Sequence, residues 1–296
     1  VKRLNPSDLQ RVAVKYLTEA NRTIFALVPN GTSQKQEYEA ELTTDHAVQP
    51  FTLPNGLRLL VKEDHRLPFV EFRLALNGGI LAESVESSGI TSLLSRMLVK
   101  GTSHRTAEQL AVAIESLGGS LEPYAGNHSF GLTAEVLSED FATGLDLFTD
   151  VLLNPAFPTE ALERERAAQL ASIRGQRDQL LQCAFKAMRH GLFGATGYGL
   201  DLSGTEASVS RLSVGDLRRF HQDWVVPTGA VLSIFGDVKA EAVVEAVEAS
   251  LKSWTGARRE LDLKTSAGQF EGRFQETRDK EQAVLALGFP GTTLAN

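Results

Sequence analysis

Residues 87–102 read SSGITSLLSRMLVKGT, and the interpretation of the whole chain depends on this stretch. Its apolar residues recur at the spacing of an amphipathic helix. Polar side chains stand inside that pattern at Ser92, Ser95 and Arg96. Residues four apart lie on one face of a helix, so Ser92 and Arg96 should project to the same side. We therefore expect a helix, and the two serines and the arginine inside its pattern need an explanation.

The bulk composition indicates a folded, globular chain. Its 296 residues suggest one large or two ordinary domains, and 42% hydrophobic with 23% charged residues allow a sizeable core. The net charge of −7, without a basic stripe, argues against nucleic acid as a partner. No apolar run in the sequence approaches the ~20 residues of a membrane helix. A single cysteine, Cys183, excludes an internal disulfide framework.

Alternation and turn signals on both sides of the opening stretch predict antiparallel strands. Residues 51–64 predict a strand pair across Asn55-Gly56, because Asn-Gly is a strong hairpin signal. Residues 69–79, FVEFRLALNGG, alternate like a half-buried strand. Residues 121–137 predict two further strands around a turn.

Helices are predicted between and after these strands. A capping box of Thr106 and Gln109 marks the start of one helix. Ser138 should cap another, which ends before Pro155. Two further helical stretches are expected, at residues 159–190 and 241–254. Antiparallel hairpins combined with helices indicate an α+β fold rather than a doubly wound α/β fold.

A helix–strand pattern at the start of the chain recurs later in the same register. The matched pairs are Asp8 with Asp216, Leu9 with Leu217, Arg11 with Arg219, Tyr16 with Trp224, and Ile24 with Leu232. Self-similarity of this kind indicates duplicated domains, although two amphipathic helix–strand units can also resemble each other by chance. Residues 31–49 are polar without periodicity and read as a linker.

The opening stretch resembles the inverted-zinc-motif helix of the pitrilysin/insulinase-type metallopeptidases, which include the mitochondrial processing peptidases. Those enzymes read roughly G-x-A-H-F-L-E-H-M-L-F-K-G-T. Residues 163–176, 204–221 and 229–238 also follow the order and spacing of the family. The resemblance covers nearly the whole chain. It implies the LuxS/processing-peptidase-like metallohydrolase fold, in which helices form one layer on a mostly antiparallel sheet.

In that family, the two histidines of H-x-x-E-H and a downstream glutamate bind zinc, and the glutamate inside the motif is the general base. The resemblance places the first histidine at Ser92, the base at Ser95 and the second histidine at Arg96. It places the downstream ligand at Ser172. A serine hydroxyl is a poor zinc ligand, and an arginine is a fixed cation. We therefore expect no catalytic residue and no bound metal in this chain.

Arg96 is expected to replace the positive charge of the metal. Glu165 lies seven residues before Ser172 and should point the same way on its helix. A bidentate contact between the guanidinium and that carboxylate would suit a partly buried pocket. The alternative is that Arg96 extends into solvent along its apolar stem.

Glu122 and Pro123 fall where active relatives have an exposed edge strand that binds substrate peptide by strand addition. Proline lacks the N–H that a peptide partner would use, so this edge should pair less readily with an added strand. The alternative is that Pro123 stands only at a strand start or a bulge.

The resemblance gives a domain interpretation for the whole chain. Residues 50–262 are one intact but inactive peptidase-like domain. Residues 1–30 are the end of a preceding family domain, residues 31–49 are the linker, and residues 263–296 are the start of a following family domain.

The function implied is that of a pseudoenzyme domain within a bacterial-type zinc metallopeptidase. It would form part of the peptide-enclosing chamber and support a zinc site in the catalytic half of the same polypeptide or in a homologous subunit. Unfolded peptide would be the substrate, and zinc would belong to the partner half. A non-enzymatic scaffold of the same fold and a hydrolase with a relocated site stay open. The compartment is not determined, with the bacterial periplasm favoured over the cytoplasm.

Overall fold

A computed structural model describes residues 6–16, 47–261, 272–279, 281–289 and 291. The chain divides into two units, residues 1–45 and 46–296, and each is considered by itself. In the first unit, α1 (Pro6–Tyr16) is a helix, as the sequence predicts. The strand expected after it and the linker, up to residue 46, lie outside the described residues.

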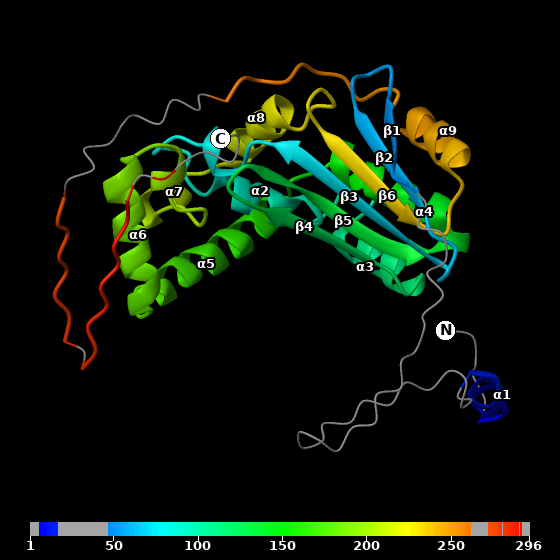
Figure 1. Ribbon diagram of the computed structural model, residues 1–296, viewed down its shortest axis with the longest axis horizontal. Helices are drawn as coiled ribbons and strands as arrows, with labels where there is room; N and C mark the ends of the chain where they lie inside the picture. Colours follow the sequence, from blue (N-terminus) through cyan, green and yellow to red (C-terminus); the bar gives the residue numbers. More distant parts are fainter. Residues whose placement is uncertain (1–5, 17–46, 262–271, 280, 290, 292–296) are drawn as a thin grey trace. The chain divides into compact units, whose positions relative to one another are not determined.

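The second unit is built on a six-stranded sheet within residues 47–261, with the order β1-β2-β6-β3-β5-β4. The strands are β1 (Gln49–Thr52), β2 (Arg58–Glu63), β3 (Phe69–Asn77), β4 (Ser120–Ala125), β5 (Ser129–Leu137) and β6 (Val231–Gly236). Neighbours pair antiparallel, except that β2 and β6 are parallel. β6, the last of these six strands in chain order, lies between β2 and β3, as Figure 1 shows.

Helices connect and cover these strands. They are α2 (Ile90–Leu98), α3 (Ala107–Ser116), α4 (Phe141–Leu153), α5 (Thr159–Gln176), α6 (Leu180–Phe193), α7 (Glu206–Val209), α8 (Val214–Trp224) and α9 (Ala240–Ser250). Short 3-10 turns are η2 (Gly79–Ala82), η3 (Ser138–Asp140) and η4 (Gly197–Gly199). The predicted α+β class with a mostly antiparallel sheet is confirmed. No helix in the described residues is long and apolar enough to cross a membrane.

The alternation of buried and exposed side chains along β3 explains why helices cover one face of the sheet. Its buried side chains are Val70, Phe72, Leu74 and Leu76. Glu71 and Arg73 project to the opposite, exposed face. Phe72 stacks on Phe141 and Phe148 of α4, with ring centroids 5.4 and 5.7 Å apart. Burial on one face and solvent on the other is the arrangement of a two-layer fold.

The predicted hairpin between β1 and β2 is confirmed. Gly56 adopts a φ of +88°, a left-handed conformation that favours glycine. The Asn55 carboxamide oxygen accepts from the Leu57 N–H at 3.1 Å, and its nitrogen donates to the Leu251 carbonyl at 3.0 Å. The turn therefore also anchors the chain beyond α9 to the β1–β2 edge.

The capping box of α3 is also confirmed. The hydroxyl of Thr106 accepts from the Gln109 N–H at 3.2 Å, and the Gln109 side chain accepts from the Thr106 N–H at 2.8 Å. Both donors would otherwise be unsatisfied at the helix start.

The prediction that Ser138 caps α4 is wrong. Ser138 begins η3, and α4 starts only at Phe141, without a side-chain cap. The Ser138 hydroxyl donates instead to the Asp237 carboxylate at 2.9 Å. A charged acceptor brought close by the end of β6 binds the hydroxyl more strongly than an uncharged acceptor would.

The helix expected across residues 159–190 is interrupted. α5 ends at Gln176, and α6 begins at Leu180. The segment that contains the break, residues 175–179, reads GQRDQ and contains no apolar side chain that packing could bury. Continued helix there would be stabilised by propensity alone, and Gly175 lowers that propensity.

The sequence predicts the start of a following family domain in residues 263–296, and such a domain would begin with its first strands. Within the described residues 272–279 and 281–289 no strand is present. The alternating side chains Leu285, Leu287 and Phe289 are 83%, 71% and 79% exposed. An extended segment becomes a strand only when another strand pairs with its backbone.

His221 on α8 gives the folded chain a predictable sensitivity to acid. Its Nε2 lies 2.8 Å from the Leu152 carbonyl, and burial lowers the pKa of the imidazole below its usual range. Because the unfolded chain then binds the proton more readily, acid should favour unfolding. The contribution of His221 to the free energy of unfolding should fall as pH drops below about 6.5, by at most about 1.4 kcal/mol per pH unit.

The measurement is urea unfolding between pH 5 and pH 8. His221→Gln keeps a donor for the carbonyl but cannot be protonated, so its unfolding free energy should depend less on pH. The difference between the two pH curves isolates His221 from the other groups that titrate in this range. Parallel curves would contradict the assignment.

Candidate functional site

A buried carboxylate anchors the start of the motif helix α2. Glu83 is 8% exposed, and it accepts from the N–H groups of Gly89 at 2.8 Å and Thr91 at 3.0 Å. These donors belong to the first turn of α2, which has no side-chain cap. Burial raises the pKa of Glu83 to about 7, against the lowering effect of both N–H donors. The start of α2 is thus held by a side chain from the segment after η2.

The polar face of α2 meets α5 through the guanidinium of Arg96. Its Nε donates to Glu165 Oε2 at 3.0 Å, and one terminal nitrogen donates to the Ser92 hydroxyl at 3.2 Å. The other terminal nitrogen donates to the Gln169 side-chain oxygen. The structure therefore brings Ser92, Arg96 and Glu165 together, as a cluster that joins two helices.

The contact between Arg96 and Glu165 is not the bidentate pair that was expected. One carboxylate oxygen faces Arg96, and the other accepts from Lys100 Nζ at 2.9 Å. Lys100 lies two residues after the end of α2, and both cations reach the same acid. Arg96 is 37% exposed and Glu165 is 17% exposed. Arg96 therefore reaches solvent in part while its Nε stays bonded across the helix pair.

Gln169 belongs to the cluster, and the sequence analysis missed it. It is 3% exposed, and its nitrogen donates to the carbonyls of Gly89 at 3.0 Å and Ser203 at 2.8 Å. Its position four residues after Glu165 was the available signal. Ser172 is exposed, and no hydrogen bond joins it to Arg96 in the described part of the chain. The longer side chain of Gln169 reaches the guanidinium instead.

Ser95 points away from this cluster and toward the edge of the sheet. It is 2% exposed, and its hydroxyl donates to the Tyr124 carbonyl at 3.1 Å. Tyr124 belongs to β4, which is the edge strand and pairs only with β5 in the sheet. Within β4, Pro123 is the fourth of six residues and pairs with Leu132 in an unbroken register. It stands neither at a strand start nor at a bulge, and Glu122 beside it is exposed.

Two family models match the chain. One is described as insulinase (peptidase family M16) and matches residues 58–206. The chain belongs to the insulinase family, peptidase family M16. The second, described as the peptidase M16 inactive domain, matches residues 211–296 of this M16 chain.

Curated relatives of this M16 chain include bacterial and mitochondrial proteins. An uncharacterized zinc protease of Streptomyces coelicolor is 29% identical over 252 residues, which are 82% of this chain and 55% of the relative. A probable mitochondrial-processing peptidase subunit beta of Arabidopsis thaliana is 29% identical over 200 residues, covering 67% of this chain and 37% of that protein. The chain thus spans about half, or less, of the length of these relatives.

Solved structures support the same fold. The peptidase M16 inactive domain from Pseudomonas fluorescens matches with a TM-score of 0.69 and 21% identity, over 73% of this chain and 53% of that one. The first half of the periplasmic protease PqqL from Escherichia coli matches with a TM-score of 0.67 and 18% identity, over 75% and 50%. At these identities the likeness shows the M16 fold alone.

The zinc that the family name implies does not fit the residues of this cluster. Its single carboxylate, Glu165, is already shared by two cations. The remaining side chains are a hydroxyl and an amide, which are weak zinc ligands, and Arg96 would repel the ion. Among the described residues, no group of three or more His, Cys, Asp or Glu side chains is placed to hold a metal.

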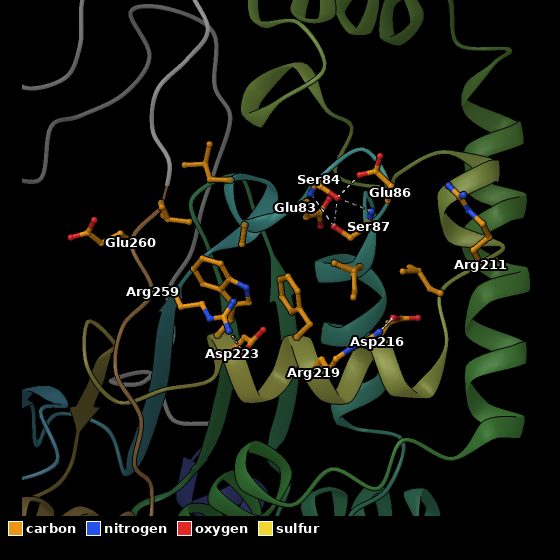
Figure 2. A pocket seen from close by; sticks show the side chains of 17 residues that line it. Glu83, Ser84, Glu86, Ser87, Arg211, Asp216, Arg219, Asp223, Arg259 and Glu260 are labelled. Atoms are coloured by element: carbon orange, nitrogen blue, oxygen red, sulfur yellow. Dashed lines mark hydrogen bonds and ion pairs between the residues drawn. The ribbon is translucent and has the colours of Figure 1, made fainter.

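Two cavities lie elsewhere on this M16 domain. One, of about 650 Å³, opens between residues 81–87, α8 and residues 259–261, as Figure 2 shows. Its rim carries an ion pair between Arg259 and Asp223 at 2.6 Å. The other, of about 820 Å³, lies where α4, α8 and α9 end. Neither is lined by the polar cluster of α2 and α5, so that cluster is separate from both.

The pair formed by Arg96 and Glu165 should contribute measurably to stability. Arg96→Met keeps most of the apolar stem, and Glu165→Gln keeps an acceptor. In a double-mutant cycle, the coupling free energy between the two substitutions should be about 1 kcal/mol. This value lies between those of exposed and of buried charged contacts. The measurement is urea unfolding at low salt.

Arg219→Met is the matched control, because Arg219 pairs on the surface with Asp216 three residues away. That change should cost less than about 0.5 kcal/mol. A coupling of zero between Arg96 and Glu165 would show that the contact adds nothing to stability.

Proposed function

We propose that this chain is a non-catalytic domain of an M16 zinc metallopeptidase. It encloses unfolded peptide and supports a zinc site carried by the other half of the polypeptide or by a homologous subunit. The observation that carries the proposal is a complete framework with an altered site. α2, α5 and β4 are all formed, while serines stand at 92, 95 and 172 and an arginine stands at 96.

Within this proposal, Arg96 replaces the charge of the metal. Its guanidinium shares Glu165, a carboxylate that is 17% exposed, with Lys100. Because Arg96 belongs to α2 and Glu165 to α5, this fixed cation joins the two helices where a metal ion is missing.

The proposal extends to the edge of the sheet. A peptide adding to β4 would find no N–H at Pro123, and this weakens strand addition. We infer that the substrate strand is bound more firmly by the partner half. A bacterial periplasmic location is part of the same proposal, supported by the bacterial relatives and by the fold shared with a periplasmic protease.

The test is zinc content and peptide cleavage by the purified chain. After incubation with zinc and desalting, elemental analysis should find no stoichiometric metal, because the ligands are absent. The chain should also leave an unstructured peptide uncut, since no metal or base is present to activate water.

A variant that restores the family residues, with Ser92→His, Ser95→Glu, Arg96→His and Ser172→Glu, serves as the positive control and should retain zinc. Stoichiometric zinc in the unaltered chain, or cleavage abolished by a chelator, would reject the proposed function.

A further inference from the structure

The polar cluster of α2 and α5 holds more positive than negative charge. Arg96 and Lys100 share the single carboxylate of Glu165, at 3.0 and 2.9 Å. The other acceptors that Arg96 contacts, the Ser92 hydroxyl and the Gln169 carbonyl oxygen, are neutral. Two cations and one anion leave the cluster with one excess positive charge.

Neighbouring charges of α5 do not remove this excess. Arg166 pairs with Glu163 of its own helix, and Arg174 pairs with Glu206. Each of those carboxylates therefore has its own cation. Glu165 is the carboxylate that faces both Arg96 and Lys100.

The cations of the cluster are also its more accessible part. The side chains of Arg96 and Lys100 are 37% and 36% exposed, whereas that of Glu165 is 17% exposed. An ammonium has three N–H donors, and Lys100 uses one of them in its contact with Glu165. A second anion can approach from solvent and bind charged donors without displacing the first.

We propose that Arg96 and Lys100 bind a carboxylate of an unfolded peptide. The carboxylate belongs either to an acidic side chain or to a free C-terminus, which offer the same two oxygens. Strand addition is weakened at the adjacent edge by Pro123. The charge of Arg96 and Lys100 therefore supplies part of the attraction for peptide that backbone hydrogen bonds of β4 do not supply. The inference extends the proposed function by naming a chemical feature of the enclosed peptides.

The test uses the whole chain and fluorescence anisotropy at low salt. The probes are short glycine–serine peptides that carry an uncharged N-terminal dye. One has an internal glutamate and an amidated C-terminus, one has a free C-terminus without glutamate, and one has glutamine with an amidated C-terminus. At least one acidic peptide should bind more tightly than the neutral peptide, and added salt should weaken that binding.

Two substitutions should change the affinity in opposite directions. Lys100→Gln removes a cation and should weaken binding about twofold to fivefold, whereas Glu165→Gln removes the competing anion and should strengthen it by a similar factor. Lys252→Gln and Glu248→Gln, on and after α9, make the same net-charge changes at exposed positions and should leave the affinity unchanged.

Preference for one acidic peptide identifies the source of the carboxylate, and binding of both supports the shared chemistry. Equal binding of the neutral peptide would overturn the proposal. It would also be overturned if the control substitutions at Lys252 and Glu248 had the same effects as those in the cluster. The assay involves neither zinc nor cleavage, so its failure leaves the proposed function to be judged by its own test.

Discussion

Under the proposed function, adding the complete downstream half that would contain this chain should raise peptide cleavage by a separately expressed catalytic upstream half about a hundredfold or more. The physical reason is positioning, because misplacing a substrate by about 1 Å can cost about a hundredfold in rate. A zinc site that faces open solvent holds an unstructured peptide poorly. A second half that closes over it would fix the peptide and exclude water.

The measurement is the initial rate of cleavage of an unstructured peptide by the upstream half alone and by the mixture. An equal amount of an unrelated protein, added in place of the downstream half, should leave the rate unchanged. If the upstream half alone matched the mixture, this domain would be dispensable for catalysis. The scaffold interpretation would then gain support.

Replacing Phe72 by alanine should lower the free energy of unfolding by about 3–5 kcal/mol. Phe72 is fully buried at the centre of β3, and its ring stacks on Phe141 and Phe148. Truncation removes both contacts and leaves a cavity between the sheet and α4, because a packed interior relaxes only partly around it.

The measurement is urea unfolding followed by circular dichroism and by tryptophan fluorescence, with coincident transitions as the test of two-state behaviour. Phe69→Ala is the matched control on the same strand. Phe69 is 42% exposed, so the same truncation should cost far less. Equal losses at the two positions would show that the side of β3 facing α4 is not the core of this unit.

Features set by neighbouring residues could be predicted from the sequence. The Asn55-Gly56 hairpin, the alternation of β3 and the capping box of Thr106 depend on contacts within a few residues, and all three are present. These three interactions are local, so the order of residues determines them. The placement of Arg96 opposite Glu165 was anticipated from the family resemblance, which brings the two helices together, combined with the helical spacing of side chains that share a face.

Other features were decided by the tertiary structure. β6 lies between β2 and β3 through pairings between residues more than 150 positions apart, which no local pattern specifies. Lys100 shares Glu165 with Arg96, and Gln169 rather than Ser172 completes the cluster, because side-chain reach across two packed helices selects the contacts. By itself, the sequence determined that serines and an arginine stand at the positions where the resemblance places the zinc ligands and the base of the family. Only the packing of α2 against α5 decided which side chains meet in their place, since a contact between two helices depends on their distance and angle.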